Sequence, residues 1–341
     1  MLTLPKDIKY IILSQLSLGS MLNFCVSCRA NLCILADDKM WRLKLCQDYP
    51  EYYDGKPASK NFKEYYKFVA YDRVRLYWNK EGNEKEISRG VKRLVSRGWR
   101  FYYIDLYDNL FMYTSKGDPN GEYYSKFLRR NVKDVNDDII LTMDGGLYDR
   151  EILISNNVRA MDTKLGITAF ITMANDLYLN DKTVEFIAPN VEKCVVGCYT
   201  DLVHIYYITL SGELWELAPY ITLTKPGDNA EILYSHRMIA KENVRDIAVT
   251  IDLMYIVDKD QKVYIYCDDN LIENNHFDGL RIQMIRGADE ETEYINFINQ
   301  NNDYCGLPDH RGPPKLLFKN VISLCMCNGD FIYIKNMISK I

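Results

Sequence analysis

The chain has 341 residues, of which 48% are hydrophobic and 26% charged, and its formal net charge is −5. This size allows one sizeable domain and a small one, and the negative charge argues against a broad nucleic-acid-binding surface. Lys6, Asp7 and Lys9 interrupt the first apolar run, and no run approaches the roughly 18 residues of a membrane span, so neither a signal peptide nor a membrane helix is expected. Ten cysteines in such a chain favour a reducing compartment.

Residues 2–49 have the spacing of three short helices. Pro5 suits a first helical turn, and the positions i, i+3, i+4 and i+8 that follow form one apolar face, made of Ile8, Ile11, Ile12 and Leu16. Ser17 is a candidate N-cap for a second helix, whose apolar face is Leu18, Met21, Leu22 and Cys25. Asp37 or Asp38 can cap a third helix, which carries Trp41 and ends before Pro50. Three helices this short make a small core, so we expect part of their apolar surface to be buried elsewhere. The alternative is a helical cap that packs on the main domain and has no other role.

This segment resembles the F-box. The matching positions are Leu4-Pro5, Ile8, Ile12, Leu16, Leu22, Cys25, Cys28-Arg29 and Trp41-Arg42. The resemblance covers roughly residues 2–48 and departs at Asn31-Leu32-Cys33, where family members often have a bulky aromatic or basic run. It implies that residues 1–48 dock on the Skp1 adaptor of a cullin-RING ubiquitin ligase. Carried over by position, the docking and packing set would be Leu4, Pro5, Ile8, Ile12, Leu16, Leu22 and Trp41.

Residues 49–72 are predicted to be a helical linker. Asn61 can cap a helix with Phe62, Tyr65, Tyr66 and Val69 on one face. Residues 73–78 then alternate like a strand.

The remainder, residues 73–341, contains repeated units. The dipeptide Asn-Val begins units at Asn131, Asn157, Asn190, Asn243 and Asn320, Gly90-Val91 begins a similar one, and Leu280-Arg281-Ile282 another. Each beginning is followed by an apolar strand, a second strand rich in Tyr and Ile, a tight turn and a third strand. The mean spacing is about 38 residues, which is typical of a β-propeller, here with six or seven blades. We expect 73–78 to pair with 331–335, because an open ring would leave exposed edges. An unrepeated β-sandwich is the alternative.

The units resemble degraded RCC1-type repeats. The best matches are Val244-Arg245-Asp246-Ile247-Ala248 and residues 208–215. The Gly-His pair and the trailing Gly-rich loop of the family unit are mostly missing. The resemblance therefore implies the fold, an RCC1-like propeller, and not nucleotide-exchange activity.

No catalytic, metal or cofactor site is expected. Cys25-x-x-Cys28 with Cys33 has partial zinc spacing, but Cys25 falls on an apolar helix face and no second pair follows. Asp144-Gly145-Gly146 predicts a hairpin turn and not a phosphate loop, because no helix follows it. The histidines have no neighbouring Cys or Ser suited to a triad; they are His204, His236, His276 and His310.

These observations predict a non-enzymatic substrate-recognition subunit of a Skp1-cullin-F-box ligase. One partner would be the Skp1-like adaptor with its cullin, and the other an unknown target protein held by propeller loops 220–240 and 299–316, with Tyr304, His310 and Arg311 as candidate contacts. Neither nucleic acid nor a membrane is an expected partner. The alternatives are an RCC1-like exchange factor or chromatin-binding propeller, and a scaffold that binds no adaptor. We expect the cytoplasm or nucleus, in a host cell if the protein is viral, since the composition resembles that of large DNA viruses or protists.

Overall fold

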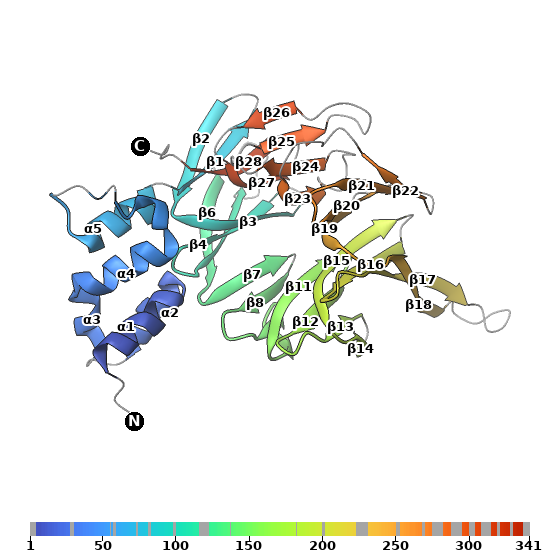
Figure 1. The fold of residues 1–341 in the computed structure, drawn as a ribbon, viewed down its shortest axis with the longest axis horizontal. Coiled ribbons are helices and arrows are strands. Elements are labelled where there is room, and N and C mark those ends of the chain that lie inside the picture. The colour runs from blue at the N-terminus through green and yellow to red at the C-terminus, as the bar shows by residue number, and fades with distance from the viewer. Residues whose placement is uncertain are drawn as a thin grey trace. The chain divides into compact units, whose positions relative to one another are not determined.

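The computed structural model describes residues 5–27, 31–54, 56, 59–72, 74–80, 83–97, 100–115, 123–136, 138–181, 183–199, 202–222, 231–249, 253–267, 270–274, 282–287, 295–299, 304–307, 315–318, 321–327 and 330–336. The chain divides into two compact units. One unit is Met1–Asp134 with Val321–Ile341, and the other is Val135–Asn320. The helices all belong to the first unit, as the blue ribbons of Figure 1 show.

The helical region, residues 5–72, begins the first unit. Its elements are α1 (Lys6–Gln15), α2 (Leu18–Ser27), α3 (Leu32–Ala36), α4 (Asp38–Asp48), the 3₁₀ turn η2 (Pro50–Tyr52), α5 (Phe62–Lys67) and the π-helical turn η3 (Phe68–Asp72). Three predicted caps are confirmed. Ser17 Oγ accepts from the Ser20 N–H at 3.1 Å, Asp37 Oδ1 from the Lys39 N–H at 3.0 Å, and Asn61 Oδ1 from the Glu64 N–H at 2.8 Å. The sequence predicted three helices before residue 50 and missed α3, because five residues are too few to show a helical period.

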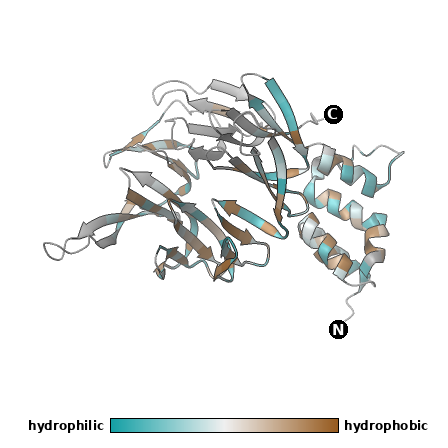
Figure 2. Cartoon of the chain, turned by 180° about the vertical axis from the view of Figure 1, so that it is seen from behind, coloured by the Kyte–Doolittle hydropathy of each residue, from teal (hydrophilic) through white to brown (hydrophobic). Residues whose placement is uncertain are grey.

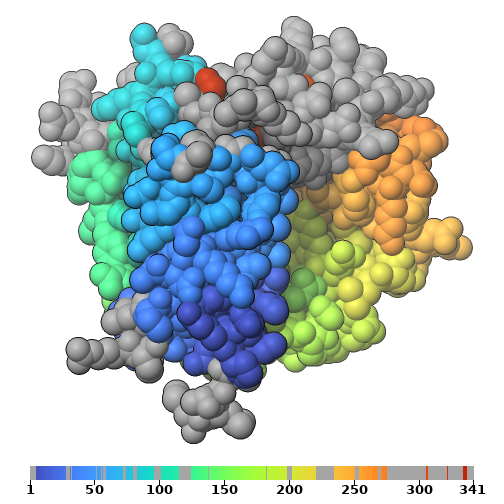
Figure 3. Space-filling model, turned by 60° about the vertical axis from the view of Figure 1, so that its left-hand side comes forward, coloured from blue at the N-terminus to red at the C-terminus, as the bar shows by residue number. Residues whose placement is uncertain are grey.

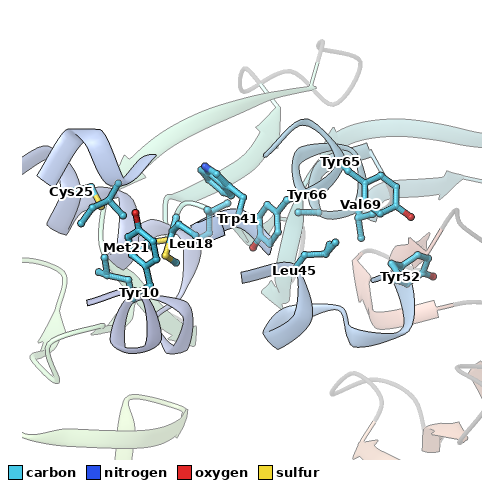
Figure 4. Close-up of a cluster of buried hydrophobic side chains, with 14 residues drawn as sticks. Tyr10, Leu18, Met21, Cys25, Trp41, Leu45, Tyr52, Tyr65, Tyr66 and Val69 are labelled. Atoms are coloured by element: carbon cyan, nitrogen blue, oxygen red, sulfur yellow. The ribbon is translucent and has the colours of Figure 1, made fainter. Parts of the chain in front are cut away.

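One apolar core runs through the helical region. Its centre is Trp41, whose ring centroid lies 5.3 Å from that of Tyr66 and whose indole N–H donates to the Leu35 carbonyl at 2.9 Å. Figure 4 shows these two rings side by side in the core. The buried members are Tyr10, Leu13, Leu18, Met21, Cys25, Ile34, Met40, Trp41, Leu45, Tyr52, Tyr65, Tyr66, Val69 and Ala70. The core continues past residue 48, so the predicted linker helix α5 packs on the helices before it.

Two four-stranded antiparallel sheets complete the first unit. One is β3 (Val91–Arg97), β4 (Arg100–Asp105), β5 (Leu110–Ser115) and β6 (Tyr123–Arg129). The other has the order β2-β1-β28-β27, from β1 (Val74–Lys80), β2 (Asn83–Arg89), β27 (Val321–Cys327) and β28 (Asp330–Asn336). In its register Leu76 lies opposite Ile334, which confirms the predicted pairing of the first strand with the last.

Five further four-stranded sheets lie in the second unit, apart from the first residues of β7. The first two sheets are β7 (Val132–Asn136), β8 (Ile139–Thr142), β9 (Leu147–Asp149) with β10 (Ile152–Ser155), and β11 (Val158–Lys164), β12 (Ile167–Thr172), β13 (Leu177–Asn180) with β14 (Val184–Ala188). The next two are β15 (Val191–Tyr199), β16 (Leu202–Thr209), β17 (Leu214–Thr222) with β18 (Glu231–Ala240), and β19 (Val244–Val249), β20 (Met254–Asp258), β21 (Val263–Cys267) with β22 (Asn270–Glu273). The last is β23 (Ile282–Gly287), β24 (Ile295–Asn299), β25 (Tyr304–Leu307) with β26 (Lys315–Phe318). The described residues thus form seven sheets, one for each predicted unit.

The repeated Asn-Val dipeptide has a backbone cause. The residue before each Val is in the left-handed region, with φ of 64° at Gly90, 59° at Asn157 and 68° at Asn243. Asn tolerates this conformation better than other side-chain-bearing residues. It lets the next N–H donate to the hairpin turn of the sheet before: the Val158 N–H donates to the Gly145 carbonyl at 2.9 Å. Asn131 and Asn190 have the same conformation, and Asn320 lies outside the described residues.

Two expectations about the units were wrong. Each unit was predicted with three strands, but the sheets have four, because outer strands such as β10 and β22 lack an apolar-polar alternation. The predicted loop 220–240 is mostly strand, since β17 extends to Thr222 and β18 is Glu231–Ala240. The predicted loop 299–316 likewise contains β25 and the start of β26.

Candidate interaction surface on the helical region

Helix α1 has a buried inner face and an exposed outer face made of isoleucines. Tyr10, Leu13 and Ser14 are buried against the core, at the i, i+3 and i+4 positions of one face. Ile8, Ile11 and Ile12 lie on the opposite face, with exposed fractions of 43%, 54% and 47%. Three of the four residues of the predicted apolar face therefore share one side of α1, which points away from the core, whereas the fourth, Leu16, lies past the end of the helix and packs against the core. Figure 3 shows the dark-blue N-terminal helices on the surface of the molecule, and Figure 2 the apolar residues, in brown, within them.

Polar contacts with α4 hold α1 along its length. Near the N-terminal end of α1, Lys6 pairs with Asp37 and Asp7 with Lys39, both at 2.7 Å. Near the C-terminal end, the side-chain amides of Gln15 and Gln47 are 3.0 Å apart. The Lys6–Asp37 and Gln15–Gln47 contacts, at the two ends of α1, fix its rotation, so the three isoleucines are presented in one orientation.

A buried lysine fastens the end of α1. The Lys44 side chain is 2% exposed, and its ammonium donates to the Ser14 carbonyl at 3.1 Å and to Asp48 Oδ1 at 2.8 Å. The Tyr66 hydroxyl donates to the other oxygen of Asp48 at 2.5 Å. Burial and the Asp48 charge raise the pKa of Tyr66 far above its ordinary value, so this phenol stays a donor. The network joins α1, α4 and α5.

The helical region is fixed to the turn between β4 and β5. Ser17 Oγ donates to Asp108 Oδ2 at 2.7 Å, and Lys92 pairs with the other oxygen of this fully buried carboxylate. Gly19 lies against the same turn: a Cβ there would be 2.6 Å from the Tyr107 carbonyl oxygen. Only glycine fits this approach without displacing backbone. The first turn of α2 is thereby attached to the sheet formed by β3, β4, β5 and β6.

The structure separates the predicted adaptor-binding residues into two groups. Pro5, Ile8 and Ile12 are exposed on or beside α1. Leu16 and Leu22 are half-buried against the core, and Trp41 is buried within it. Leu4 lies outside the described residues. Sequence reasoning did not single out Phe24 and Val26 of α2, which are 44% and 66% exposed, because they fall off the predicted apolar face of that helix.

Comparisons with known proteins identify the fold. No protein-family model matches the chain, and no curated protein matches it in sequence. Among solved structures, Prp20p from Saccharomyces cerevisiae, studied for its binding to Gsp1p and histones, is 10% identical, with a TM-score of 0.57 over 81% of this chain and 95% of that one. Yeast RCC1 (Prp20) bound to Kap60 is also 10% identical, with a TM-score of 0.58 over 78% of this chain and 89% of that one. Human WBSCR16 is 8% identical, with a TM-score of 0.53 over 78% of this chain and 99% of that one.

The chain has an RCC1-like β-propeller fold. The seven sheets in the described residues are its blades, within the predicted range of six or seven. Of the residues predicted to contact a target on the propeller, Tyr304 begins β25, and His310 and Arg311 lie outside the described residues. None of the described helices has the length and apolar character needed to cross a bilayer.

One ionic cluster lies within the blades. Glu216, which is 2% exposed, accepts from Arg237 Nε at 2.8 Å and lies 2.8 Å from His204 Nδ1. Burial alone would raise the pKa of Glu216, but the hydrogen bonds from His204 and Arg237 lower it below its ordinary value. The cluster joins β16, β17 and β18. The Glu216 carboxylate pairs with Arg237 and His204 within the cluster, as in a structural ion network.

Asp37 gives the helical region a testable response to acid. The hydrogen bonds from Lys6, Tyr10 and the Lys39 N–H lower the pKa of this carboxyl from 3.8 to about 2. Because the folded pKa is lowered, the stabilisation is complete above about pH 4 and is lost as the pH falls from there through about 2. At pH 7 we expect Asp37→Ala to cost about 1 kcal/mol, as for other N-cap losses, and this difference to shrink below pH 4. Urea unfolding of both proteins at pH 7, 4 and 2.5 measures it; a difference independent of pH would contradict the ionised cap.

Proposed function

We propose that this protein is the substrate-recognition subunit of a Skp1-cullin-F-box ubiquitin ligase. The helical region would bind a Skp1-like adaptor, and the propeller would hold the protein to be ubiquitylated. The single observation that carries the proposal is the outward isoleucine face of α1. Two of its residues, Ile8 and Ile12, are positions at which the sequence resembles the F-box, and Pro5, another such position, is exposed beside α1.

The energetics favour a partner over a free surface. Fully burying an isoleucine side chain contributes about 1.5 to 3 kcal/mol, so three of them on one held helix can anchor a protein interface. Grouped apolar residues on a soluble protein mark interaction sites more often than single ones do. The alternative is a helical cap that only packs on the blades. It explains the buried inner face of α1 and the Ser17–Asp108 contact, but it does not explain why three isoleucines lie together on the exposed outer face.

The assignment of the target to the propeller rests on the fold. Propellers present many loops on a rigid scaffold, and functional contacts concentrate in such loops. The similar yeast propeller was studied for its binding to Gsp1p and histones and has been seen with Kap60 bound. Tyr304, His310 and Arg311 remain our proposed target contacts, in or beside the segment that follows β24. We propose no enzymatic role, and a place in the cytoplasm or nucleus.

The experiment is reconstitution with purified Skp1. We expect the full-length chain and Skp1 to co-elute from a size-exclusion column as a 1:1 complex, and addition of the cullin amino-terminal domain to give a ternary complex. The runner-up, an exchange factor of the RCC1 type, predicts instead accelerated guanine-nucleotide release from a partner protein and no Skp1 complex. If neither a Skp1 complex nor nucleotide release were observed, the remaining hypothesis would be a scaffold that binds no adaptor. Absence of a Skp1 complex, with the protein folded, contradicts our proposal.

A further inference from the structure

A cleft of about 260 Å³, here called the junction cleft, lies between the helices and the β4–β5 turn. Its walls come from α2, α4, α5, η3 and the β4–β5 turn, through the residues Leu18, Leu22, Trp41, Lys63, Tyr66, Lys67, Ala70, Tyr71, Leu106 and Tyr107. Figure 4 shows three of these wall residues, Leu18, Trp41 and Tyr66, as neighbours in the core. The cleft is distinct from the isoleucine face of α1.

The walls of the junction cleft offer apolar surface. The Trp41 indole N–H is used by the Leu35 carbonyl, and the Tyr66 hydroxyl by Asp48. Leu18, Leu22, Ala70 and Leu106 have no side-chain polar atoms. Tyr71 and Tyr107 add two exposed rings that carry hydroxyls, so an occupant gains mainly from burying an apolar group.

The charge on the lining is positive. Lys63 and Lys67 are one helical turn apart on α5, and the Lys63 ammonium is 6.0 Å from the centroid of the Trp41 ring. In the described part of the chain neither ammonium forms an ion pair, and the nearby Asp48 carboxylate is taken up by Lys44 and Tyr66. Asp38 Oδ1 accepts from the backbone N–H of Lys63 at 3.2 Å and not from its ammonium. Two cations that form no ion pair among the described residues, beside an apolar cleft, favour a ligand that carries an acid next to an apolar group.

The size of the cleft limits the occupant further. Pockets for drug-sized ligands usually enclose about 300 to 1,000 Å³, so 260 Å³ suits one large side chain. We propose that the junction cleft binds an acidic peptide through one phenylalanine or leucine anchor, with Lys63 and Lys67 pairing with flanking carboxylates. This inference goes beyond the proposed function and does not depend on adaptor binding.

The test is fluorescence polarisation with the full-length protein and a labelled acidic heptapeptide that has a central phenylalanine. We expect saturable binding, weakened about three- to tenfold by Lys63→Gln with Lys67→Gln, the range expected for two exposed ion pairs. Replacing the peptide's phenylalanine by alanine should weaken binding at least as much. The matched control is Lys85→Gln with Lys126→Gln, which removes the same charge at exposed positions of β2 and β6 and should leave the affinity unchanged.

Three results would overturn the proposal. They are no saturable binding up to about 1 mM peptide, equal effects of the two lysine pairs, or equal affinity of the phenylalanine and alanine peptides. The substitution of Ile8 and Ile12 should not alter peptide binding. Failure of the junction cleft is thus distinguishable from failure of adaptor docking.

Discussion

Replacing Ile8 and Ile12 by serine together is expected to weaken Skp1 binding strongly while leaving the protein folded. Both side chains are about half exposed, at 43% and 47%, so the free protein loses little packing. In the complex, two buried anchors would be lost, at a cost of about 2 to 4 kcal/mol, or roughly 30- to 1,000-fold in Kd. Isothermal titration calorimetry with purified Skp1 measures the change.

The matched control for this pair is Leu271→Ser with Ile272→Ser on β22. These residues are similarly exposed, at 46% and 59%, but belong to the outermost strand of a blade. We expect the control to bind Skp1 with unchanged affinity. If both pairs weakened binding equally, the effect would be general and α1 would not be the docking element.

Lys44→Met is expected to destabilise the helical region strongly. It keeps the length and apolar stem of the side chain but leaves the Ser14 carbonyl without its donor and Asp48 without its cation. Removing one partner of a buried ion pair typically costs about 3 to 5 kcal/mol, and the partial exposure of Asp48, at 24%, favours the lower end. Hydrogen exchange of the α1 amides measures the local loss.

The contacts of Lys44 with the end of α1 also predict that Lys44→Met affects Skp1 binding. Because Lys44 holds the C-terminal end of α1, its loss should weaken Skp1 binding although the residue is buried. Lys39→Met, at an exposed position with a surface partner, is the control and should change neither exchange nor binding appreciably. Unchanged α1 exchange in Lys44→Met would show that the Ser14 and Asp48 contacts do not stabilise the helix.

The sequence predicted elements whose cause is local. Ser17, Asp37 and Asn61 act as caps through contacts two or three residues away, and the Asn-Val repeats reflect a backbone conformation that asparagine tolerates. The pairing of β1 with β28 could be predicted as well, because the repeats required a partner for the first strand. The caps and the Asn-Val positions need no knowledge of distant packing.

The sequence could not predict which face of helix α1 would point toward the core. The spacing of Ile8, Ile11 and Ile12 predicted an apolar face but not that Tyr10 and Leu13 would form the inner one. That choice depends on α4, whose Lys44 and Asp37 contact α1 from positions about 30 residues away. The junction cleft could not be predicted from the sequence either, because its walls come from five separate elements. The outer strands were missed because exposure on both faces removes the periodicity that identifies a strand.

The most direct test of the central claim is hydrogen–deuterium exchange of the full-length protein with and without saturating Skp1. Our account predicts that exchange slows in α1 and α2, around Ile8, Ile12 and Phe24, and stays unchanged in the propeller blades. Protection confined to the propeller, or no protection anywhere at a Skp1 concentration well above that of the protein, would contradict docking through the helical region.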